Sequence, residues 1–150
     1  MKHILVTTDF SPLADTAVPA AADLARRLGA KLTLANIVTS DRPPKPDPEA
    51  PYYKVAQRLW EADKELEAQV TASLRERAQK LEGLDVGVAI GRGNAVEGII
   101  ALARDIAADL IVISSQGRTG LARVFLGSVA EEMARVSPIP VLIWKAPPAE

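Results

Sequence analysis

The residues with the greatest potential for chemistry follow a strongly apolar segment late in the chain. Leu110–Ser114 (LIVIS) is apolar enough to predict a central buried strand. The loop behind it, Gln116–Gly127, carries three glycines, which let backbone N–H groups approach an anion closely. Ser128 then opens a helix, whose first N–H groups and positive dipole end attract phosphate. Arg118 and Arg123 supply counter-charges, so the segment is a candidate phosphate-binding loop.

A purely structural interpretation of the same segment stays open. Ser128 and Glu131 have the spacing of a capping box, in which each side chain satisfies a backbone donor of the other residue. The glycines can serve turns alone. The segment also lacks the G-K-[ST] ending of a P-loop and the G-x-G-x-x-G pattern of dinucleotide-binding folds.

Asp9 is the second candidate, because it ends the first predicted strand after Thr7 and Thr8. A carboxylate there can accept hydrogen bonds from a ribose or an adenine, or help to hold a metal ion through a triphosphate. The alternative is an N-cap for the first helix. A phospho-acceptor aspartate is less favoured, because such sites need further acidic residues at the same edge.

Composition excludes several classes of protein. The chain has 150 residues, no cysteine and a net charge of −1, which argues against cysteine chemistry, nucleic-acid binding and binding to anionic membranes. The lone histidine, His3, precedes the first strand and lies opposite the predicted ligand edge. No G-x-S-x-G elbow occurs, which argues against a serine hydrolase of that type. No constellation of paired carboxylates or histidines suggests a metal or glycosidase site. No apolar run approaches the roughly 20 residues of a membrane span, and MKHILVTTDF does not resemble a signal peptide. We therefore expect a cytoplasmic protein.

The elements that must position these residues alternate along the chain. Strands are predicted at 4–6, 32–38, 85–90, 110–114 and 140–144, and helices at 11–28, 55–81, 95–107 and 128–136. Pro19 should bend the first helix, and Gly91-Arg92-Gly93 is expected to form a turn. The alternation predicts a single α/β domain with a doubly wound parallel sheet and helices on both faces. Ligands of such sheets bind at the carboxyl ends of the strands.

The longest predicted helix, 55–81, follows a proline-rich loop at Ser40–Tyr53. Its apolar stripe predicts packing on the sheet rather than a coiled coil, because the a/d pattern is not strict over its whole length. The stripe consists of Val55, Leu59, Ala62, Leu66, Val70, Leu74, Ala78 and Leu81.

Three segments, in this order, resemble the universal stress protein family. They are ILVTTDFS at 4–11, the pair GRTG at 117–120 and GSVAE at 127–131, and SPIPVLI at 137–143. The resemblance implies a five-stranded parallel sheet in the order 3-2-1-4-5. It also implies a homodimer in which the last strands pair, through Val141, Leu142, Ile143 and Trp144. A short apolar edge strand suits such pairing, since it would otherwise favour aggregation.

The ATP-binding branch of that family has a glycine, two residues, a glycine, nine residues, and then glycine with serine or threonine. Gly117, Gly127 and Ser128 fit, but Ser114 stands at the first glycine. Gln116 replaces a common histidine, and Thr7 replaces a common proline. The resemblance implies contacts of Asp9 with the nucleoside, of Thr7 and Ile37 with adenine, and of Gly117, Gly127, Ser128 and Val129 with phosphates. It also implies nucleotide-binding positions at Thr8, Ile113, Ser114 and Arg118.

Three functions remain open at this level. The first is a dimeric stress-response protein that binds ATP or AMP, with Mg²⁺ arriving on the ATP. The second is a protein-interaction module that has lost the nucleotide and binds unidentified protein partners through the long helix and the loop before it. The third is an ATP-cleaving enzyme, which is least favoured because no general base is found; hydrolysis is expected to be slow at most. Ser114 separates the first two: serine is strained there if the backbone needs a positive φ, and fits if only small size is needed.

Overall fold

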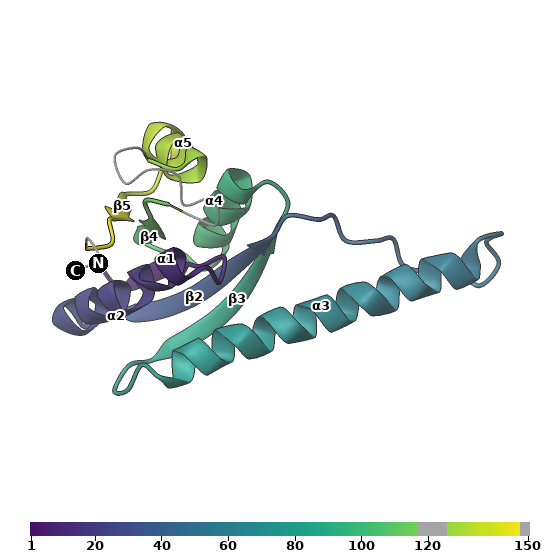
Figure 1. Cartoon of the computed structure of the whole chain (residues 1–150), viewed down its shortest axis with the longest axis horizontal. Coiled ribbons are helices and arrows are strands. Elements are labelled where there is room, and N and C mark those ends of the chain that lie inside the picture. Colours follow the sequence, from purple (N-terminus) through teal and green to yellow (C-terminus); the bar gives the residue numbers. More distant parts are fainter. Residues whose placement is uncertain (117–125, 148–150) are drawn as a thin grey trace.

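The computed structural model describes residues 1–116 and 126–147. Its parallel sheet has five strands in the order β3-β2-β1-β4-β5, which confirms the order implied by the family resemblance (Figure 1). The strands are β1 (His3–Thr7), β2 (Lys31–Val38), β3 (Val86–Arg92), β4 (Leu110–Ser114) and β5 (Val141–Trp144). The helices are α1 (Pro12–Asp15), α2 (Ala17–Leu28), α3 (Tyr53–Gln79), α4 (Ala95–Asp105) and α5 (Ser128–Val136).

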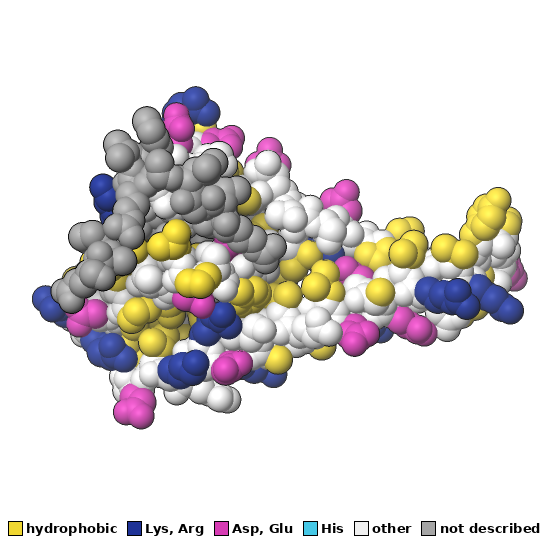
Figure 2. All heavy atoms as spheres, in the orientation of Figure 1, with side chains coloured by type: hydrophobic (Ala, Val, Ile, Leu, Met, Phe, Trp, Pro, Cys, Tyr) yellow, Lys and Arg dark blue, Asp and Glu magenta, His cyan; other side chains and the backbone are white. Residues whose placement is uncertain are grey.

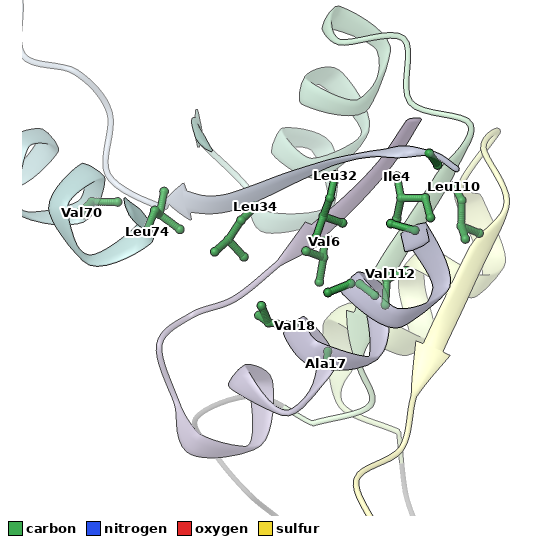
Figure 3. Packing of buried hydrophobic residues seen from close by; sticks show 14 of the residues in the cluster. Ile4, Val6, Ala17, Val18, Leu32, Leu34, Val70, Leu74, Leu110 and Val112 are labelled. Carbon is green, nitrogen blue, oxygen red and sulfur yellow. The ribbon is translucent and has the colours of Figure 1, made fainter. Parts of the chain in front are cut away.

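Helices cover both faces of the sheet, as the doubly wound class requires. Side chains of a strand alternate between its faces, so Ile4 and Val6 of β1 pack with α2 and with the end of α3 (Figure 3). Leu5 lies between them and packs on the opposite face with α4 and α5. Two apolar cores result, and each fixes the strand ends that carry the candidate residues.

The first predicted helix is divided in two. Ser11 caps α1 as expected, with its Oγ accepting a hydrogen bond from Ala14 N at 3.2 Å. The helix breaks at Thr16, between α1 and α2. Pro19 explains the break, because it has no N–H to offer Asp15, four residues earlier, and its ring crowds that carbonyl. Gly29 closes α2 with φ 63°, the left-handed conformation expected of a C-cap.

The expected turn at Gly91-Arg92-Gly93 is wrong in part. Gly91 and Arg92 still belong to β3, where they pair with Ile37 and Val38 of β2. A Cβ on Gly91 would come within 2.5 Å of Ile37 Cδ1, so this glycine permits close packing rather than a bend. Of these three residues, only Gly93, at φ 97°, needs the freedom of glycine to turn the chain.

Only the second half of α3 packs on the sheet, so the expectation for the whole stripe is wrong. Val70 and Leu74 are buried against β2 (Figure 3), whereas Val55 and Leu59 are each 57% exposed. The helix has 27 residues and is therefore about 40 Å long, longer than the strands beside it. Its first half projects from the body of the protein (Figure 1).

Ion pairs fix α3 where it leaves the sheet. Arg92 of β3 donates to both Asp63 oxygens at 2.8 and 2.9 Å and to Glu67 Oε1 at 3.0 Å. Arg42, from the proline-rich loop, also bonds Glu67. The hydrogen bond from Arg92 and the charges of both arginines hold the pKa of Glu67 below its ordinary value. The direction in which α3 projects is thus set by charges on β3 and on the loop.

Two further sequence expectations concern location and His3. Among the described residues, no helix is long and apolar enough to cross a membrane. The cytoplasmic location stays a prediction. His3 lies at the start of β1, away from the ligand edge, where its ring nitrogens contact Ile106 O and Thr33 Oγ1 at 3.0 and 2.7 Å.

Candidate functional site

A pocket of about 690 Å³ opens at the carboxyl edge of the sheet, where β1 lies between β2 and β4. Chain connections leave in opposite directions on either side of β1, and this is where parallel sheets bind ligands. The volume is in the range of small-molecule sites. The sequence-predicted residues that line it are Thr7, Thr8, Asp9, Ile37, Ser114, Gly127, Ser128 and Val129.

The other sequence-predicted residues lie elsewhere. Ile113 is 3% exposed, belongs to the core beneath α4 and α5, and is not among the lining residues. Gly117 and Arg118, together with Arg123, lie outside the described residues. Val141–Trp144 form β5, at the edge of the sheet and separate from the pocket.

The corner between β1 and α1 is held in an unusual backbone conformation. Phe10 has φ 68°, which costs a non-glycine residue roughly 1–2 kcal/mol. Thr8 compensates, because its Oγ1 accepts a hydrogen bond from Phe10 N at 2.9 Å and donates to Asp15 Oδ1 at 2.7 Å. Strain of this kind concentrates at functional sites, where the surrounding structure holds it in place.

Asp9 lies inside this corner and lines the pocket. Its Oδ1 accepts a hydrogen bond from Ser11 N at 2.9 Å, so it closes a local turn and leaves the capping of α1 to Ser11. The interpretation of Asp9 as the helix N-cap is therefore wrong. Its carboxylate is fixed at the pocket wall, where it can accept hydrogen bonds from a ligand hydroxyl or amine.

Asn36 supports the corner from β2 and was not predicted from the sequence. It is 8% exposed, and its Nδ2 donates to Thr8 O at 2.9 Å. The signal was a polar amide inside a mostly apolar strand, LTLANIV. Such a buried amide must find a partner, and here the partner is the strand end beside Asp9.

Ser114 adopts an ordinary backbone conformation. Among the described residues, only Phe10 and Ala107 have a positive φ without being glycine. Ser114 Oγ donates to Gln116 O at 2.8 Å, and Leu13 O is a second, more distant acceptor at 3.3 Å. The position therefore does not need the conformational freedom of glycine, and serine is not strained there.

The capping box predicted at Ser128 and Glu131 is wrong. Gly127 is the N-cap of α5, no side chain caps the helix, and Ser128 is its exposed first residue. Gly127 N donates to Ser115 O at 2.6 Å, which holds the start of α5 against the end of β4. The first residues of α5, Ser128 and Val129, line the pocket, and no described side chain caps their amides, an arrangement suited to an anion.

Helix α3 also contributes to the lining of the pocket, and the sequence did not predict this. The α3 side chains that line it are Leu66, Gln69, Val70 and Ser73. The heptad-like apolar pattern explains Leu66 and Val70 as packing residues, but nothing in it distinguishes Gln69 and Ser73 from the polar residues around them. Only the packing of α3 across the strand ends brings them to the site.

No cluster of three or more His, Cys, Asp or Glu side chains that could hold a metal ion occurs in the described part of the chain. A divalent cation at this pocket would therefore depend on the phosphates of a ligand for much of its coordination.

Comparison with known proteins decides the family. The model of the universal stress protein family matches residues 1–145. The chain belongs to the universal stress protein family. Its membership agrees with the strand order.

Individual members of the universal stress protein family are distant in sequence but similar in fold. Universal stress protein MJ0531 of Methanocaldococcus jannaschii is 28% identical, over 99% of this chain and 85% of its own length. The structure of MJ0577, from the same organism, is 27% identical, with a TM-score of 0.78 over 99% of this chain and 98% of its own. A universal stress protein solved in complex with cAMP is 27% identical, with a TM-score of 0.63 over 95% of both chains.

Proposed function

We propose that this protein is a stress-response protein that binds ATP or AMP in the pocket at the carboxyl edge of the sheet. The observation that carries the proposal is the meeting, in one pocket, of a fixed carboxylate and an uncapped helix start. Asp9 supplies the first and the backbone at Gly127–Val129 the second. A nucleotide has a nucleoside that suits a carboxylate and phosphates that suit helix amides. The relative in complex with cAMP supports an adenine ligand.

The lining residues divide into two groups under this proposal. Thr7 and Ile37, at the ends of β1 and β2, would contact the adenine, and Asp9 would accept hydrogen bonds from the nucleoside. Ser128 and Val129 would hold the phosphates through their backbone N–H groups, and Gly127, whose own N–H donates to Ser115 O, would let the phosphates approach closely. Gly117 and Arg118 stay proposed phosphate contacts from the sequence. The ordinary backbone of Ser114 supports tolerance of serine at the first glycine position.

The protein would act through its bound state rather than through turnover. Asp9 is the carboxylate among the described residues that line the pocket, and it accepts a hydrogen bond from Ser11 N; under this proposal its remaining lone pairs are directed at the nucleoside rather than at the phosphates. A general base for hydrolysis needs a free lone pair directed at an attacking water. We therefore propose that ATP is held, with Mg²⁺ on its phosphates, and that cleavage is slow at most.

We also propose that β5 pairs with β5 of a second copy. Ile111 N donates to Pro140 O, and Ser115 N donates to Trp144 O. Because the hydrogen-bonding groups of a strand alternate in direction, the N–H and C=O groups of Val141 and Ile143 point away from β4. Trp144 Nε1 is buried without a hydrogen-bond partner in the described chain. An added strand would pair the open backbone edge and can supply an acceptor for this indole.

Titration calorimetry of nucleotide-free protein with Mg-ATP and with AMP tests nucleotide binding. We expect micromolar affinity for wild type and its loss in Gly127→Val, whose side chain would obstruct the phosphate approach. Gly87→Val is the matched control, because a Cβ there meets only Thr33 Oγ1, at 3.6 Å, and the position lies in β3. A folded wild-type protein that binds neither nucleotide contradicts the proposal and leaves the interaction module as the function.

Light scattering tests the dimer separately. Ile143→Pro removes an outward N–H but keeps the bonds to β4, so we expect the measured mass to fall by half. Ile143→Val retains the N–H and should remain a dimer. A monomeric wild type, or a dimer that survives the proline, contradicts pairing through β5.

A further inference from the structure

The projecting half of α3 carries an exposed apolar surface that no part of the described chain covers. We call this part the exposed stripe, and it consists of Tyr52, which precedes α3, and of Val55, Leu59, Ala62 and Leu66. Tyr52 is 78% exposed, Val55 and Leu59 are each 57% exposed, and Leu66 is 38% exposed. Hydrophobic side chains recur along this projecting part of the molecule (Figure 2). A lone helix segment of this length is marginal in water, so burial of the stripe would stabilise it.

The spacing of the stripe differs from that of the packed half of α3. From Tyr52 to Leu66 the apolar residues follow steps of three and four in alternation, the repeat of a coiled coil. Beyond Leu66 the steps become four, to Val70 and Leu74, and these two pack on the sheet. The pattern changes where the helix leaves the body, so the two halves of α3 have different partners.

The neighbouring face of the same segment is already occupied. Asp63 and Glu67 bind Arg92, and Arg42 of the proline-rich loop also bonds Glu67. Lys64 Nζ lies 5.6 Å from the centre of the Trp60 ring. These contacts leave the stripe as the face that is free to receive another helix.

The charges that flank the stripe indicate what that helix is. Arg58 and Glu65 lie beside the stripe and are seven residues apart, so they occupy the same position of two successive heptads. Neither forms an ion pair within the described chain. If two copies pair in antiparallel orientation, Leu59 faces Ala62 of the partner subunit, and Val55 faces Leu66 of the partner subunit. Arg58 then lies beside Glu65 of the partner subunit, and symmetry repeats the pair.

A parallel pair lacks this complementarity. It would place Arg58 beside Asp63 of the partner subunit, but Asp63 is 10% exposed and already accepts two hydrogen bonds from Arg92. The antiparallel arrangement uses charges that are free, whereas the parallel arrangement competes with a formed ion pair.

We propose that the projecting half of α3 pairs with the same segment of a second copy as a short antiparallel coiled coil. The surface is distinct from β5. Helix α3 packs beside β2 and β3, at one edge of the sheet, whereas β5 forms the opposite edge. The inference therefore stands whether or not β5 pairs. Leu66 also lines the pocket, so the pairing is tested on nucleotide-free protein. If both surfaces pair, the coiled coil joins dimers into a larger symmetric assembly.

Disulfide trapping tests the pairing directly, because the chain contains no cysteine. Val55→Cys and Leu66→Cys are prepared as separate proteins, mixed and oxidised over a dilution series. In the antiparallel pair, Cys at 55 of one copy faces Cys at 66 of the other. Two copies of the same variant place their thiols about 16 Å apart along the helix, which is beyond disulfide reach. We expect the mixture to form at least about tenfold more cross-linked dimer than either variant alone, a free-energy difference of about 1.4 kcal/mol.

Lys54→Cys mixed with Ala68→Cys is the matched control. Both positions are exposed, and in the antiparallel pair they lie at nearly the same height along the helix axis, as positions 55 and 66 do. In the heptad they belong to the outer face of the helix, away from the partner. All four cysteines replace exposed side chains, so circular dichroism should report wild-type folding. Equal yields from the control and the test mixture, or efficient self-cross-linking of Val55→Cys alone, would overturn the antiparallel pair.

Charge reversal tests whether Arg58 and Glu65 select the partner. Arg58→Glu in both chains of the Val55→Cys and Leu66→Cys mixture should reduce the yield several-fold. Adding Glu65→Arg to both chains should restore it, since the attraction returns with its signs exchanged. Recovery is expected only if Arg58 of one copy lies beside Glu65 of another copy. If the double reversal does not restore the yield, the proposal that the partner is a second copy is contradicted.

Discussion

Arg77 of α3 and Asp15 of α1 are 62 positions apart in the chain and form a two-point ion pair. Nε lies 2.9 Å from Oδ1, and Nη2 lies 2.8 Å from Oδ2. The guanidinium carbon also lies 4.7 Å from the centre of the Phe10 ring. Arg77 thus holds both ends of the strained corner that places Asp9 in the pocket, and it connects the longest helix to the candidate site.

We expect Arg77→Ala to weaken nucleotide binding without touching the nucleotide. Loss of hydrogen bonds to a carboxylate costs about 1.5–3 kcal/mol, and part of that cost should appear as a looser β1–α1 corner. Calorimetry would then show weaker ATP binding, and urea unfolding a lower stability. Arg75→Ala, an exposed neighbour on the same helix, is the control. Unchanged affinity in Arg77→Ala would show that the corner holds its shape without the ion pair.

The same pair predicts a loss of stability in acid. Burial alone would raise the pKa of Asp15, but hydrogen bonds from Arg77 and Thr8 and the charge of Arg77 lower it below the ordinary 3.8. The folded protein therefore prefers the carboxylate, so this stabilisation is present above the ordinary pKa and is lost as pH falls through the lowered one. The difference in urea midpoint between wild type and Asp15→Asn should be constant near neutral pH and shrink below pH 3.8. A difference that persists in strong acid would contradict this origin.

Substitutions at Ser114 separate the requirement for size from the requirement for conformation. Ser114→Gly loses the hydrogen bond to Gln116 O and gains backbone freedom, so unfolding free energy should fall by about 1–2 kcal/mol. Nucleotide affinity should be equal or tighter, because no special φ is needed there. Ser114→Val should weaken binding by about tenfold or more, about 1.4 kcal/mol, because it places bulk at the pocket wall. The measurements are calorimetry and urea unfolding, and weaker binding in Ser114→Gly would give the hydroxyl a direct role.

Gly98 should resist alanine although it lies in a helix. Alanine normally stabilises a helix interior by about 1 kcal/mol relative to glycine. Here its Cβ would come within 2.8 Å of Ile37 Cγ2 and 3.1 Å of Arg92 O, so overpacking should lower the unfolding free energy by about 1–3 kcal/mol. Because Ile37 lines the pocket, nucleotide affinity should fall as well. Gly87→Ala, with ordinary contact at 3.6 Å, is the control, and a stabilised Gly98→Ala would show that α4 can move away.

Local patterns predicted the elements well where one physical cause dominated. The run LIVIS specified β4, and Ser11-Pro12 and Gly29 specified where the first helical segment begins and ends. The strand order followed from the resemblance to the universal stress protein family rather than from any local pattern. Predictions failed where one residue type serves several purposes. The pattern around Gly91 predicts a turn, but this glycine permits close packing against Ile37. The pattern at Ser128 predicts a cap, but Ser128 follows Gly127, which is the N-cap of α5.

The sequence by itself determined which segments are buried strands and where polar residues follow them, because periodicity and caps are local properties of the chain. It thereby located Asp9, Ser114 and Gly127 at one edge of the sheet. Only the tertiary structure decided that Asn36 and Gln69 line the pocket and that Arg77 supports its β1–α1 corner, since their neighbours come from distant segments. It alone also decided that α3 packs along half of its length, because the sheet ends before the helix does.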